Sequence, residues 1–89
     1  MVSRARVYDG REVTVSDEVV EHIVRKHPEM LALLRLSKAR LPDVVCEALE
    51  HPTQVYVDAR GAEYFLRRMG DYNRNVIVSE RRVRTVYLN

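Results

Sequence analysis

Apolar and polar residues alternate near both ends of this 89-residue chain and follow a helical period between them. Residues 4–8 and 12–15 alternate in the manner of two short strands, and Asp9-Gly10 between them is a typical hairpin turn. The pattern therefore predicts a short β-hairpin at the N-terminus.

A helix is predicted to follow the hairpin. Ser16 is a good N-cap, and the acidic residues after it suit the positive end of a helix. Four apolar residues then fall on one stripe at helical spacing: Val19, Val20, Ile23 and Val24. Pro28 ends or kinks this helix.

Two histidines belong to this predicted helix. His27 falls in the middle of the apolar stripe, His22 lies at its edge, and Arg25 faces away from it. Imidazole changes charge near neutral pH, so histidines beside fixed cations suit acid–base chemistry on a phosphate ester. The alternative is an ordinary helix end with a partly buried histidine.

The second half of the chain changes from helix to strand. The leucine-rich residues 30–36 predict a second helical piece, and residues 42–50 predict a third helix that stops at His51-Pro52. Strands are then predicted over residues 53–58, 62–69, 75–79 and 83–88. Their short connections predict antiparallel neighbours. We therefore expect one α+β domain over residues 1–89, with N-terminal helices packed on a roughly four-stranded antiparallel sheet, preceded by the short hairpin.

Charge is unevenly distributed along the chain. Residues 60–84 carry a net charge of +4, whereas residues 9–50 carry −3. Thirteen of the fifteen cations are arginine, which suits bidentate contacts with phosphate. A basic second half indicates an anionic partner, and nucleic acid is the commonest one. An arginine bias from genome composition or a hot habitat is the alternative explanation.

Several kinds of chemistry lack support in the sequence. His22 and His27 are five residues apart, and neither a cysteine pair nor a tight acidic cluster accompanies them, so no metal or other cofactor is expected. Cys46 is the one cysteine and is interpreted as a small hydrophobe on a helix face. No run approaches the roughly 20 apolar residues of a membrane span, so no membrane contact and a cytoplasmic location are expected.

The chemistry that the sequence still supports is acid–base cleavage of RNA without a metal. His22 or His27 would serve as base or acid, and Arg67 or Arg68 would hold the phosphate. Hydroxyl donors on the predicted strands are Tyr64, Thr85 and Tyr87, and Tyr64 shares a strand face with Arg68. Each of these residues also has an ordinary structural interpretation, as strand filler or as one member of an ion pair.

Five segments of the chain resemble a known domain in their order and spacing. They are H-I-V-R-K-H-P-E at 22–29, A-L-E-H-P-T-Q-V-Y at 48–56, R-G-A-E-Y-F-L-R-R-M-G-D at 60–71, N-V-I-V at 75–78 and R-T-V-Y-L at 84–88. From about residue 16 onward the chain resembles the phage and bacterial domain grouped with the barnase, EndoU, colicin and RelE-like nucleases. The strands at 4–15 lie outside this resemblance and are interpreted as an addition particular to this chain.

The resemblance implies helices against a four-stranded antiparallel sheet and metal-independent ribonuclease activity, as in toxins and phage proteins. Carried over by position, it assigns the helix motif to His22, Arg25 and His27. The strand arginine becomes Arg67 or Arg68 beside Tyr64, and the final-strand hydroxyl becomes Thr85.

Three functions are therefore in competition. The first is a toxin-like endoribonuclease that cleaves RNA through its own 2′-hydroxyl, with His22, His27, Arg67 and Thr85 as catalytic residues. Its substrate-binding residues would be Arg25, Arg60, Tyr64, Arg68, Arg82 and Tyr87. The second is a catalytically silent nucleic-acid-binding module. The third is a protein-interaction domain with an antitoxin-like or phage partner, which would use an exposed patch at residues 30–36.

Overall fold

The computed structural model describes residues 2–89, and within that range it contains six strands and three α-helices. In chain order these are β1 (Val2–Arg6), β2 (Glu12–Ser16), α1 (Asp17–Lys26), α2 (Glu29–Leu34), α3 (Leu41–Glu50), β3 (Gln54–Val57), β4 (Glu63–Met69), β5 (Tyr72–Ser79) and β6 (Arg82–Leu88). A short 3₁₀ turn, Lys38–Arg40, leads into α3.

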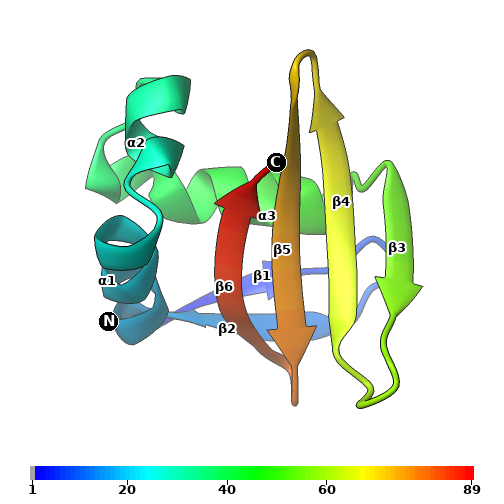
Figure 1. The fold of residues 1–89 in the computed structure, drawn as a ribbon. Coiled ribbons are helices and arrows are strands. Elements are labelled where there is room, and N and C mark those ends of the chain that lie inside the picture. Colours follow the sequence, from blue (N-terminus) through cyan, green and yellow to red (C-terminus); the bar gives the residue numbers. More distant parts are fainter. Residues whose placement is uncertain (1) are drawn as a thin grey trace.

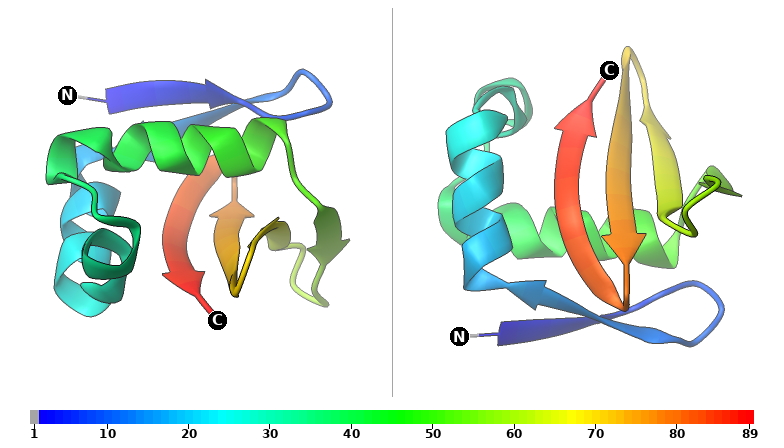
Figure 2. Two further views of the ribbon diagram at one scale, coloured as in Figure 1. Left: turned by 90° about the horizontal axis from the view of Figure 1, so that it is seen from above. Right: turned by 60° about the horizontal axis from the view of Figure 1, so that its bottom comes forward.

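All six strands form a single sheet in the order β1-β2-β6-β5-β4-β3. Every neighbouring pair is antiparallel except β2 and β6, which run parallel where Thr14 lies opposite Arg82. The backbone N–H of Thr14 donates to the carbonyl of Arg81 at 2.8 Å across this junction. The sheet curls so that β1 and β2 lie on one side of α3 and strands β3–β6 on the other (Figure 2).

The predicted architecture is therefore wrong in two respects. The sheet is six-stranded and mixed, because the N-terminal hairpin is part of it and not an addition before it. The helices also do not form one N-terminal layer. α3 packs inside the curl, against β1, β4 and β5, whereas α1 and α2 lie beside β6 (Figure 1).

Burial explains why the hairpin joins the sheet. Ala5, Val7, Val13 and Val15 are at most 4% exposed and form one core with α3 and the later strands. The loop of the hairpin is also tied down, because Arg11 makes a bidentate ion pair with Glu63 at 2.7 and 2.8 Å. Covering these apolar side chains favours the curled sheet over a free hairpin.

Local signals account for α1. Ser16 Oγ accepts a hydrogen bond from the backbone N–H of Val19 at 3.2 Å, as expected of an N-cap. Val19, Val20 and Ile23 are buried, which confirms the predicted apolar stripe. The helix ends at His27, whose N–H donates to the carbonyl of Ile23 at 2.8 Å.

The leucine-rich segment does not form an exposed patch. Met30 is fully buried, Leu31 and Leu34 pack against the core, and Leu33 is 47% exposed. Helix α2 stops at Arg35, which adopts a left-handed conformation with φ of 52°. One exposed leucine gives little support to the protein-interaction hypothesis.

No helix within residues 2–89 is long and apolar enough to cross a bilayer.

Candidate functional site on the open face of the sheet

One face of strands β3–β6 packs against α3, and the other face points away from it. Phe65, Val76 and Val86 point toward α3 and are fully buried. By alternation and register, the other face carries Gln54, Tyr56, Tyr64, Leu66, Arg68, Asn73, Asn75, Ile77, Thr85 and Tyr87. We call this set the open face, although Asn75 within it is buried; Figure 1 views the sheet from this side, with α3 behind it. The set contains one arginine and neither an aspartate nor a glutamate.

His27, which ends α1, lies beside the open face at β6, and His22 on α1 lies next to His27. The His27 ring lies 6.1 Å from the Tyr87 ring, and the His22 ring lies 6.1 Å from the His27 ring in an edge-to-face arrangement. His27 Nδ1 lies 3.4 Å from Glu29 Oε1, within ion-pair range when the imidazole is protonated. Both histidine side chains are half-buried, so they are held in place and still reach solvent.

A second aromatic group lies at the opposite edge. Tyr56 on β3 and Tyr64 on β4 stack in parallel, with ring centroids 4.8 Å apart and planes 8° apart. The Tyr64 hydroxyl donates to Asp58 Oδ2 at 3.1 Å, while Asp58 Oδ1 accepts from the N–H groups of Arg60 and Ala62 at 2.8 and 3.0 Å. The turn between β3 and β4 thus fixes the Tyr64 ring.

These hydrogen bonds change the acidity of both groups. The N–H of Arg60 is the main reason that the pKa of Asp58 lies below its ordinary value. The hydrogen bond to the Asp58 carboxylate in turn raises the pKa of Tyr64, which stays a phenol. The pKa of Tyr87 is also raised, first by burial and then by the nearby Tyr56 phenol. The three phenols are therefore close enough to influence one another electrostatically.

Tyr56 was not among the site residues predicted from the sequence. Its strand was predicted, but its position opposite Tyr64 depends on the register between β3 and β4. The available signal was the alternation of residues 53–58, which puts Tyr56 on the face opposite to Val55.

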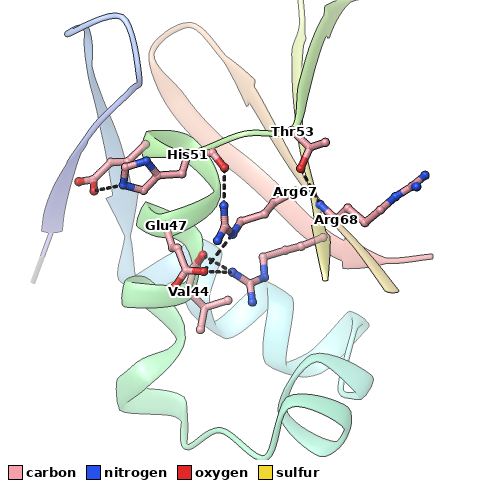
Figure 3. A network of polar contacts seen from close by, with 8 residues as sticks. Val44, Glu47, His51, Thr53, Arg67 and Arg68 are labelled. Carbon is pink, nitrogen blue, oxygen red and sulfur yellow. Dashed lines mark hydrogen bonds and ion pairs between the residues drawn. The ribbon is translucent and has the colours of Figure 1, made fainter. Parts of the chain in front are cut away.

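Arg67 does not join the histidines. It lies on the α3 side of β4, where its Nε donates to Glu47 Oε1 at 3.0 Å and its Nη1 to the carbonyl of His51 at 2.7 Å (Figure 3). Glu47 Oε1 also lies 3.7 Å from Nη1 of the buried Arg74. Arg67 therefore helps to hold the end of α3 on the sheet.

Arg68 is the arginine of this pair that reaches the open face. Its backbone N–H donates to Thr53 Oγ1 at 3.0 Å, and its exposed side chain extends away from the Arg67–Glu47 contacts (Figure 3). The sequence left open whether Arg67 or Arg68 would face a ligand. Arg67 lies on the strand face that packs on α3, so Arg68 is the one on the open face.

Thr85 shares the open face with Tyr87, but its hydroxyl oxygen is buried and has no hydrogen-bond partner among residues 2–89. Its hydroxyl is thus not presented to a ligand at the surface. The remaining predicted residues are exposed: Arg25 on α1, Arg60 in the β3–β4 turn and Arg82 at the start of β6. The structure thus brings His22, His27 and Tyr87 together, whereas Tyr64 and Arg68 share the face of the sheet with Tyr87 but lie on β4.

Across residues 2–89, no group of three or more histidine, cysteine, aspartate and glutamate side chains is placed to hold a metal ion together. Cys46 is half-buried on α3, and burial raises the pKa of its thiol, in keeping with a thiol that packs against the core.

No family model matches the chain, and no curated protein matches it either. The resemblance to the barnase, EndoU, colicin and RelE-like nucleases thus stays a prediction from the sequence.

Proposed function

We propose that the protein is a small, metal-independent endoribonuclease that binds RNA on the open face and cleaves it beside His27 and Tyr87. The observation that carries this proposal is the contact series from His22 to His27 to Tyr87 at the edge of a face without carboxylates. A phosphodiester near this edge would meet imidazole and phenol groups and no fixed negative charge from the sheet. A cytoplasmic location would fit such a substrate.

The proposed chemistry needs one base and one acid. The base takes the proton of the 2′-hydroxyl, whose oxygen attacks the phosphorus and forms a 2′,3′-cyclic phosphate. The acid gives its proton to the departing 5′-oxygen, so that the two imidazoles exchange protonation states in this step. His22 and His27, with ring centroids 6.1 Å apart, would supply this pair. Tyr87, whose ring lies 6.1 Å from that of His27, carries a hydroxyl that can donate to the phosphate oxygens.

Cleavage of single-stranded RNA in the presence of EDTA tests this function. We expect products with 2′,3′-cyclic phosphate ends, and at least a tenfold loss of rate in His27→Gln and in His22→Gln, the scale of a lost general acid or base. His51→Gln is the matched control, since this third histidine is exposed at the far end of α3. Full activity in both α1 variants, or cleavage that stops in EDTA, would contradict the proposal.

A nucleic-acid-binding module without activity is the second candidate. Two observations favour it: Arg67 is committed to Glu47 and His51, and the Thr85 hydroxyl is buried. Two of the four residues first predicted for catalysis are therefore unavailable. This candidate predicts that the wild-type protein binds RNA without product and that both histidine variants keep full affinity.

A further inference from the structure

We infer that the stacked pair Tyr56–Tyr64 is a binding site for an unpaired base, so that the substrate is single-stranded RNA held across the sheet. This inference rests on the proposed function, because it assumes that the phosphate to be cleaved lies at His27. It adds a second contact point at the opposite edge of the open face, on strands that carry no histidine.

The pair is ready to bind before any ligand arrives. Tyr64 is fixed at both ends, by its strand and by the hydrogen bond from its hydroxyl to Asp58. Tyr56 lies parallel on Tyr64 and is 42% exposed at the edge of the sheet. A held aromatic ring loses little conformational entropy on binding, and it stacks with any base because every base has a π-face.

Charge on the surrounding residues selects a polyanion as the occupant. Arg60 in the β3–β4 turn and Arg68 near the other end of β4 lie on either side of the tyrosine pair along the strand. The nearest acid, Asp58, is engaged by two backbone N–H groups and the Tyr64 hydroxyl. An RNA strand could therefore place a base on Tyr56 with a phosphate toward each arginine. Bases in a duplex are already paired and stacked, so a duplex could not do this.

The strand order of the sheet gives the approximate separation of the two contact points. From β3 to β6 there are three interstrand spacings, roughly 14 Å. Neighbouring bases in a stacked strand are about 3.4 Å apart. A strand of six nucleotides is thus long enough to reach both contact points.

Binding of a 2′-O-methyl hexanucleotide, which lacks the attacking hydroxyl, tests the inference without cleavage. We expect Tyr56→Ala to raise Kd roughly tenfold or more, the loss of one base–aromatic stack, and Tyr56→Phe to bind like the wild type. Tyr72→Ala is the matched control, because Tyr72 is 37% exposed but lies opposite Met69, on the other face of the sheet. Should Tyr56→Ala fail to fold, Tyr56→Leu makes the same test with an apolar side chain of closer size.

The possible outcomes separate this inference from the proposed function. Unchanged affinity in Tyr56→Ala, equal affinity for a duplex, or no binding by the wild type would overturn the base-binding site. Loss of affinity in Tyr56→Ala together with full cleavage by the His22 and His27 variants would keep the base-binding site and overturn the proposed catalytic residues.

Discussion

A buried hydroxyl without a partner costs free energy in the folded state, and Thr85 Oγ1 is such a group within residues 2–89. Valine has nearly the same shape and no hydroxyl. We therefore expect Thr85→Val to raise the free energy of unfolding by about 1–2 kcal/mol and to leave RNA cleavage unchanged. Urea unfolding and the cleavage assay measure the two effects. A tenfold loss of cleavage in a stable Thr85→Val protein would restore Thr85 as a catalytic residue.

At the scale of elements, the β3–β4 connection depends on the charge of Asp58. Because the folded-state pKa of Asp58 is depressed, its ionised form stabilises the fold. This contribution is complete above the unfolded-state pKa, near 4, and is lost as the pH falls through the folded-state pKa. We expect acidification from pH 5 to pH 2 to lower the stability of the wild type more than that of Asp58→Ala, measured by urea unfolding at each pH.

Asp9 also makes stability depend on pH, because its pKa is depressed as well, mainly by the N–H of Arg11. Asp9 is present in both the wild type and Asp58→Ala, so its contribution cancels when their pH profiles of stability are subtracted. Coincident pH profiles for the wild type and Asp58→Ala would show that the hydrogen bonds from Arg60, Ala62 and Tyr64 do not stabilise the turn.

At the scale of the whole molecule, the hairpin and the later strands share one core. Val15 on β2 is 2% exposed and Val76 on β5 is fully buried, and both belong to the same apolar cluster. We expect Val15→Ala and Val76→Ala to lower the free energy of unfolding by similar amounts, about 2 kcal/mol each, within a single cooperative transition. A second transition, or an undisturbed stability in Val15→Ala alone, would show that the hairpin is a separate addition.

The parts of this fold that were predictable are those set by neighbouring residues. The cap at Ser16 and the stripe of α1 lie within one helix, and the turns at Gly61, at Gly70 and at Glu80-Arg81 divide the later strands. The parallel junction of β2 with β6 was not predictable in this way. It joins residues far apart in the sequence, and the packing of both strands against α1 arises only once the chain is folded.

The candidate site was predictable to a similar degree. Alternation showed that Arg67 and Arg68 face opposite sides of a strand, but only the burial of Phe65 against α3 decides which side is open. The pairing of Tyr56 with Tyr64 likewise needed the register of two strands. His27 was predicted on the apolar stripe, and its neighbour Tyr87 comes from a strand 60 residues later.

The central claim is that RNA binds on the open face, and the ring signals of the five tyrosines test it most directly. In an NMR titration with the 2′-O-methyl hexanucleotide, we expect the rings of Tyr56, Tyr64 and Tyr87 to shift together with that of His27. The ring signals of Tyr8 in the hairpin and of Tyr72 on the other face should not shift, although both side chains are exposed. Shifts confined to Tyr8 and Tyr72, or no shift in any ring, would contradict the account.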